Sequence, residues 1–124
     1  MGLAWNVKYY RRANGEVPAK EFIAGLPAKH QAKALYAVDM LGEFGADLHE
    51  PFAKPIQGQR YKGLWELRIR FANDISRIFY FVPVGDTFVL LHGFVKKTNA
   101  IPASELERAK RCMDECLARC EDDG

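Results

Sequence analysis

Five basic residues have the types and the spacing to hold a phosphate group. Arg68 and Arg70 alternate in the segment "ELRIR", Arg77 follows in "SRIFY", and Lys96 and Lys97 are adjacent in "LLHGFVKKTNAIP". A planar guanidinium can donate two parallel hydrogen bonds to a phosphate, and a lysine supplies a compact positive charge. The residue types therefore point to the binding of an anion.

The expected strands bring the three arginines together. In "LWELRIRF" apolar residues alternate with Glu66, Arg68 and Arg70, so both arginines lie on one face of a strand. "ANDI" predicts a hairpin turn, and the partner strand "SRIFYFV" carries Arg77 to the side of this pair. Three guanidiniums so close repel one another unless an anion lies between them. The alternative interpretation is an exposed, salt-bridged sheet face with Glu66 and Asp74 as partners.

The two lysines end the next strand, "TFVLLHGFV". Because side chains alternate along a strand, one of Lys96 and Lys97 faces the arginines, and a bulge at Gly93 would exchange them. His92 lies in the same apolar strand, and we interpret it as a core histidine, with a role as a base as the alternative. The strands of Arg77 and His92 are apolar at nearly every position, which predicts that both of their faces are covered.

The other elements are read from their periodicity. "AWNVKYY" predicts a first strand, and "AKEFIAGL" predicts a short helix that ends at Gly25 and Pro27. A longer helix is expected from Pro27 to about Phe44, with Gly45 as its stop, followed by a connecting loop over residues 46–63.

The C-terminal segment "PASELERAKRCMDECLARC" predicts a final helix. Ser104 and Glu107 form a candidate capping box, and its apolar stripe is predicted to contain Leu106, Ala109, Met113 and Leu117. The order β-α-α-β-β-β-α predicts an α+β fold, in which a small, twisted, mainly antiparallel sheet of about four strands packs with helices.

Composition is that of a globular protein. The 124 residues are 48% hydrophobic and 27% charged, which predicts a single domain over residues 1–124, with residues 118–124 as a flexible tail. The net charge is only +2, but the segment from Lys54 to Lys97 holds eight basic and three acidic residues. Such a basic block is typical of a site for a polyanion or an acidic partner. The chain has no apolar run of about 18 residues and no signal-peptide pattern at its start, so we expect a cytoplasmic protein without a membrane partner.

Motifs for metal or cofactor chemistry are not found in the sequence. The histidines are scattered, and neither a phosphate-binding glycine loop nor a zinc-binding helix motif is present. Cys112, Cys116 and Cys120 are spaced by four, so a helix aligns them on one stripe. We interpret them as packing or surface thiols and not as a metal or redox face, and we expect neither a cofactor nor a metal.

The chain resembles the RelE/HigB superfamily of toxins from type II toxin–antitoxin systems, specifically its phage-derived HigB-like branch. The resemblance runs from about Trp5 to Arg111 and depends mainly on "LWELRIRF", "RIFY" and "LLHGFVKKT", in this order and spacing. "YY", "NG", "P" and "EF" between Tyr9 and Phe22, and "LP" with "AK" between Leu26 and Lys33, agree with it.

The resemblance implies a RelE-like fold and a ribosome-dependent, metal-independent endoribonuclease that cuts messenger RNA. In such enzymes the ribose 2′-hydroxyl attacks the adjacent phosphate, and an antitoxin, often of the helix-turn-helix type, silences the activity. DNA would be met only through the antitoxin. By position, the family's basic site residues correspond to Arg68, Arg70, Arg77, Lys96 and Lys97. The general base stays open among Lys96, Lys97 and His92.

One segment departs from the family pattern. The branch more often has "KKTQKTP", whereas this chain has "KKTNAIP", so that Ala100 replaces a third cation and Ile101 a threonine. The alternatives to an active toxin are a degenerate toxin or a non-catalytic, phage-derived protein that binds nucleic acid. A metal-dependent nuclease is a third alternative, which the lack of clustered acidic residues disfavours.

Overall fold

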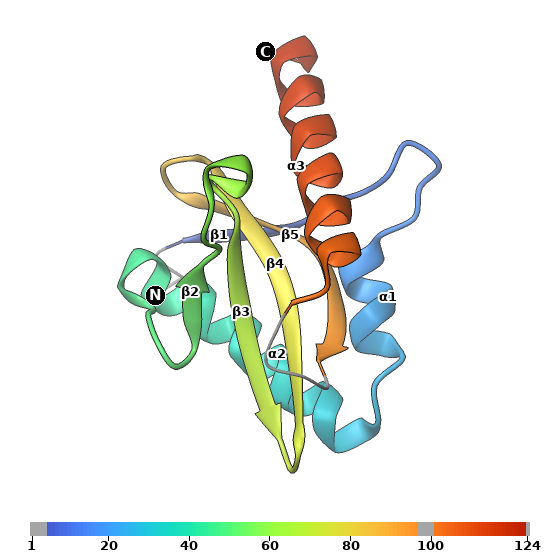
Figure 1. Cartoon of the computed structure of the whole chain (residues 1–124), viewed down its shortest axis with the longest axis vertical. Helices are drawn as coiled ribbons and strands as arrows, with labels where there is room; N and C mark the ends of the chain where they lie inside the picture. Colours follow the sequence, from blue (N-terminus) through green and yellow to red (C-terminus); the bar gives the residue numbers. More distant parts are fainter. Residues whose placement is uncertain (1–4, 97–100, 124) are drawn as a thin grey trace.

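The computed structural model describes residues 5–96 and 101–123 and has the expected α+β architecture (Figure 1). Its elements follow the chain in the order β1 (Asn6–Tyr9), α1 (Pro18–Ala24), α2 (Ala28–Phe44), η1 (Gly45–Asp47), β2 (Ala53–Pro55), η2 (Gln59–Tyr61), β3 (Trp65–Phe71), β4 (Asp74–Val84), β5 (Thr87–Lys96) and α3 (Ala103–Asp123). Here η1 and η2 are single turns of 3-10 helix. The predicted stop of the second helix is confirmed, because α2 ends at Phe44 and the residue that caps it, Gly45, has a positive φ of 50°.

The sheet has five strands in the order β1-β5-β4-β3-β2, with β1 parallel to β5 and the other pairs antiparallel. The prediction of a loop throughout residues 46–63 is wrong, because β2 lies within it and adds a fifth strand. A three-residue strand of alanine, lysine and proline is too short to show alternation and has weak strand propensity. It forms because its backbone pairs with the edge of β3, where Ala53 lies opposite Leu67 and is fully buried.

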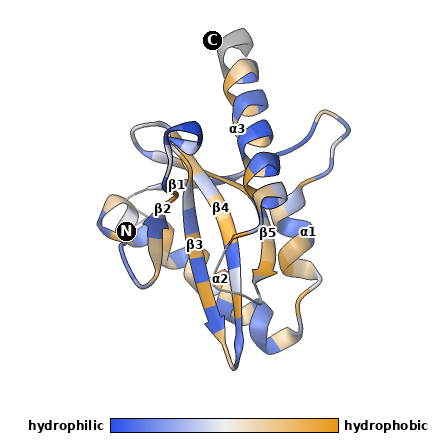
Figure 2. Cartoon of the chain, viewed as in Figure 1, coloured by the Kyte–Doolittle hydropathy of each residue, from blue (hydrophilic) through white to orange (hydrophobic). Residues whose placement is uncertain are grey.

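Helices cover both faces of the sheet (Figure 1). On one face, α1 and α2 pack through Ile23, Ala34 and Leu41 against residues such as Leu67 and Leu90. Burial of each large apolar side chain contributes roughly 1.5–3 kcal/mol. The hydropathy of β3 alternates along the strand, as expected for one core-facing and one polar side (Figure 2).

On the other face, α3 covers the central strands. Ala109, Cys112 and Met113 of α3 pack on a second apolar cluster that includes Phe79 and Leu91. The prediction that β4 and β5 are covered on both faces is therefore confirmed.

Two details predicted for the C-terminal helix are wrong. Leu117 is 37% exposed, because the helix extends past the sheet at this point, whereas Ala109 and Met113 of the predicted stripe are buried together with Cys112 (Figure 1). Ser104 lies inside the helix and not at its cap, and Glu107 binds a different partner, described below. Within residues 5–96 and 101–123, no helix combines the length and the apolar character needed to span a bilayer.

Candidate phosphate-binding site

The hairpin of β3 and β4 brings the arginines together as predicted. Arg68 lies directly opposite Arg77 in the register, and Arg70 lies opposite Ile75, so all three arginines share one face of the sheet. The two-residue turn at Ala72 and Asn73, where Ala72 has a positive φ of 54°, sets this register. Arg77 is only 3% exposed, Arg68 is partly buried and Arg70 is exposed.

A buried carboxylate compensates part of this charge. Glu66 is 0% exposed, and its Oε1 pairs with Nη1 of Arg77 and lies 3.7 Å from Nε of Arg68. The alternative of an exposed salt-bridged face is therefore correct for Glu66 as a partner and wrong about exposure at Glu66 and Arg77, which are both buried. Asp74 pairs with Phe71 in the register and so belongs to the opposite face of the sheet. Burial lowers the pKa of Arg77, but a guanidinium still keeps its charge at neutral pH.

The arginines open into a cleft of about 450 Å³. Among the described residues that line it, four are basic (Lys54, Arg68, Arg70 and Arg77) and one is acidic (Glu66). Its other walls are polar at Gln57 and apolar elsewhere, with side chains that include Ile75 from the sheet and Leu106 from α3. The cleft thus has a surplus of positive charge in partly dehydrated surroundings, where an anion is attracted more strongly than in water.

Lys54 is a residue of the cleft that the sequence did not predict. It lies on β2 directly opposite Glu66, so the register puts it on the face of the arginines. Its position depends on the strand that the sequence did not reveal. The only signal in the sequence was that Lys54 begins the basic block.

The assignment of Lys96 and Lys97 to the phosphate site stays a prediction. In the backbone register of β5, Lys96 lies opposite Ile75, the residue that is also opposite Arg70. Lys97 lies outside the described residues, as does Ala100 in the departing segment. The bulge is not at Gly93, because the register shifts between Phe79 and Tyr80, which pair with His92 and Leu90.

Gly93 is a point of close packing between β5 and α1. It pairs regularly with Ile78, and a side chain at this position would overlap the ring of Phe22 on α1. The glycine therefore allows α1 to lie close to β5.

His92 is a core residue. It is 1% exposed, its ring lies 5.2 Å from that of Phe79, and its Nε2 lies 3.4 Å from a carboxylate oxygen of Glu105. Burial lowers its pKa to about 3, and the nearby charges of Arg108 and Arg12 also act to lower it, so the imidazole is neutral at pH 7. It lines a separate cavity of about 310 Å³, beside Phe22 and Arg108, and not the arginine cleft. This location supports the structural interpretation of His92 over a role as the base.

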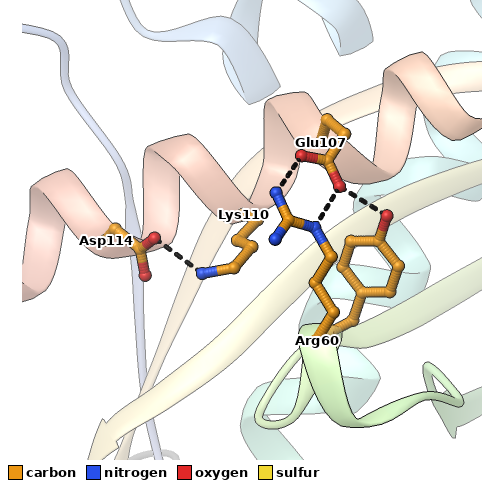
Figure 3. Close-up of polar contacts among 5 residues, drawn as sticks. Arg60, Glu107, Lys110 and Asp114 are labelled. Carbon is orange, nitrogen blue, oxygen red and sulfur yellow. Dashed lines mark hydrogen bonds and ion pairs between the residues drawn. The ribbon is translucent and has the colours of Figure 1, made fainter.

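A polar cluster fastens α3 next to the cleft (Figure 3). Arg60 of η2 donates hydrogen bonds to the two carboxylate oxygens of Glu107, from Nε at 2.7 Å and from Nη2 at 2.5 Å, and the hydroxyl of Tyr61 donates a third at 2.5 Å. The hydrogen bonds from Arg60 and then Tyr61 lower the pKa of Glu107 to about 2. Because Leu106 is the preceding residue of α3, this contact also positions the apolar wall of the cleft.

The part of the chain that is similar to a known protein family contains the residues of the cleft. No curated protein matches the chain. Residues 21–114 match the sequence pattern of the family described as phage-derived protein Gp49-like (DUF891), and this stretch includes the four basic residues of the cleft. Since the match covers more than half of the sequence, the chain belongs to the phage-derived Gp49-like protein family.

Proposed function

We propose that this protein is the toxin of a type II toxin–antitoxin system, an endoribonuclease of the RelE/HigB type that cuts messenger RNA on the ribosome in the cytoplasm. The observation that carries the proposal is the cleft in which, among the described residues, Arg68, Arg70, Arg77 and Lys54 surround one carboxylate. Membership in the Gp49-like family and the resemblance of "LWELRIRF" and "RIFY" to RelE/HigB toxins support it.

The proposed chemistry needs fixed positive charge and no metal. When a ribose 2′-hydroxyl attacks the adjacent phosphorus, negative charge grows on the phosphate oxygens, and one oriented donor stabilises such a transition state by about 3 kcal/mol. Two cations can reach an incoming phosphate: Arg68, which is partly buried, and Arg70, which is exposed. Arg77 is held by Glu66 at the base of the cleft, from which it adds positive potential. Lys96 and Lys97 complete the proposed set, with one of them as the candidate general base.

The test is cleavage of a defined messenger RNA on purified translating ribosomes, mapped by primer extension. We expect cleavage that persists in EDTA. Replacement of the exposed cleft residue in Arg70→Gln should lower the rate by about tenfold, equivalent to about 1.4 kcal/mol, and relieve growth arrest on induced expression. Lys29→Gln, an exposed cation of α2 outside the cleft, is the matched control and should cleave normally.

Arg77→Ala is a poor first test, because it would leave the buried Glu66 without its main partner and destabilise the fold. Salt-sensitive RNA binding without cleavage would instead favour the non-catalytic nucleic-acid-binding protein. Loss of cleavage in EDTA would contradict the metal-independent mechanism.

A further inference from the structure

A second groove lies on the other side of the arginines. It has a volume of about 340 Å³ and runs between α2 and the outer edge of β3. Tyr36 and Met40 of α2 and Phe52 before β2 give it apolar walls, and Lys33 adds a positive charge. Arg68 and Arg70 border the groove at the edge of the strand, with their side chains on the face of the anion cleft. Tyr36 is 64% exposed and Phe52 is 47% exposed, although both are large aromatic side chains.

The edge of β3 is open along this groove. In the part of the chain that the structure describes, β2 pairs with β3 only over residues 65–67, and the backbone bond from Arg68 N to Phe52 O follows directly. β3 continues to Phe71, past Leu67, which lies opposite the first residue of β2 (Figure 1). Because backbone groups point to alternate sides along a strand, the N–H and C=O of Arg70 face the same way as the N–H of Arg68, toward the groove. Open edges of this kind accept an added strand.

We propose that this groove is the docking site for an extended segment of a partner protein, which adds as a strand along residues 69–71. The charge and shape of the groove define the segment. Alternate side chains of an added strand would point toward the apolar wall of Tyr36 and Met40 and toward the guanidiniums of Arg68 and Arg70. The matching sequence is therefore one in which apolar and acidic residues alternate.

Occupation of the groove would also close the anion cleft. Arg68, Arg70 and Ile75 line both the groove and the cleft, so an acidic segment that binds these arginines removes them from a phosphate. This consequence depends on the proposed function, in which the cleft holds RNA, whereas the docking of the segment does not. The fold thus contains a surface at which a protein partner can inhibit by competing for the same two cations.

Peptide selection on the immobilised full chain tests the proposal directly, with a displayed library of 12-residue peptides as the probe. We expect the library to yield sequences with alternating apolar and acidic residues. For a fluorescently labelled selected peptide, Tyr36→Asp should weaken binding at least tenfold. Leu35→Asp is the matched control, since Leu35 is a neighbouring residue of α2 that is 46% exposed but does not line the groove, and it should change affinity less than twofold. Thermal unfolding of both variants checks that each is folded.

Two further measurements separate the possible occupants. N-methylation of the central amides of the peptide should abolish binding if the segment adds as a strand, and a 12-nucleotide single-stranded RNA should compete with the peptide. Selected peptides without acidic residues, or equal losses in the two α2 variants, would overturn the proposal. So would a Tyr36→Asp variant that loses affinity for the RNA and not for the peptide, because the groove would then be a site for nucleobases. Peptide binding in a protein that never cleaves messenger RNA would instead contradict only the proposed function.

Discussion

The buried ion pair of Glu66 and Arg77 makes a quantitative prediction about stability. Removal of one partner from a buried pair usually costs about 3–5 kcal/mol, because the other charge stays buried without compensation. The structure predicts that the two sides are unequal. Glu66→Met leaves Arg77, which is 3% exposed, without the carboxylate that it contacts and should cost the full amount.

Removal of the arginine should cost less. In Arg77→Met, Glu66 keeps Arg68, whose Nε lies 3.7 Å from Oε1, so a loss of about 2–3 kcal/mol is expected. The double variant removes both charges and fills the space with apolar groups of similar length, and its stability should lie within about 1 kcal/mol of the parent. The two substitutions are therefore strongly coupled and not additive.

Urea unfolding of the four proteins, followed by circular dichroism, measures this coupling through linear extrapolation of the free energy of unfolding. A variant too unstable for extrapolation is compared by its midpoint temperature. Single losses that add in the double variant, or that both stay below about 1 kcal/mol, would show that Glu66 and Arg77 do not stabilise the fold as a buried pair. Cleavage by the double variant gives a further readout, since a stable but inactive protein would show that Arg77 also acts on the phosphate.

Two other predictions concern the packing. The pKa of His92 is about 3 in the folded chain and about 6.5 when unfolded, so only the unfolded state takes up a proton between these values. The free energy of unfolding should therefore fall as the pH is lowered from about 6.5 to 3, by up to about 1.4 kcal/mol per pH unit, and His92→Leu should reduce this slope in acid titrations of stability. His49→Gln, at an exposed histidine, is the control, and an unchanged slope in His92→Leu would contradict the assignment. Gly45→Ala should lower stability by about 2 kcal/mol or more, because a Cβ at this position overlaps the indole of Trp5 and the φ is positive. The control is Gly85→Ala, where the added Cβ meets no atom within 4 Å, and it should change the midpoint of thermal unfolding little. Equal shifts of the midpoint in the two variants would refute the predicted clash at Gly45.

Much of the site could be predicted because strand alternation is a local property. The spacing of Arg68 and Arg70 places them on one face whatever the rest of the chain does, and a short hairpin turn leaves Arg77 few possible positions. The position of Lys54 could not be predicted, since β2 exists only through its backbone pairing with β3. The shift of the register near Leu90 and the exposure of Leu117 depend on contacts between distant segments as well.

The sequence by itself determined the order of the main elements, the α+β class and the gathering of three arginines on one face of the sheet. Each follows from periodicity within a dozen residues, where the geometry of strands and helices leaves little freedom. Only the tertiary structure decided which charges are compensated. It buried Glu66 beside Arg77, left Arg70 exposed, and separated His92 from the cleft, because burial depends on the elements that pack over each face. The tertiary structure also starts β2 at Ala53, opposite Leu67, so that β3 runs on to Phe71 beside the groove where we infer that a partner adds its strand.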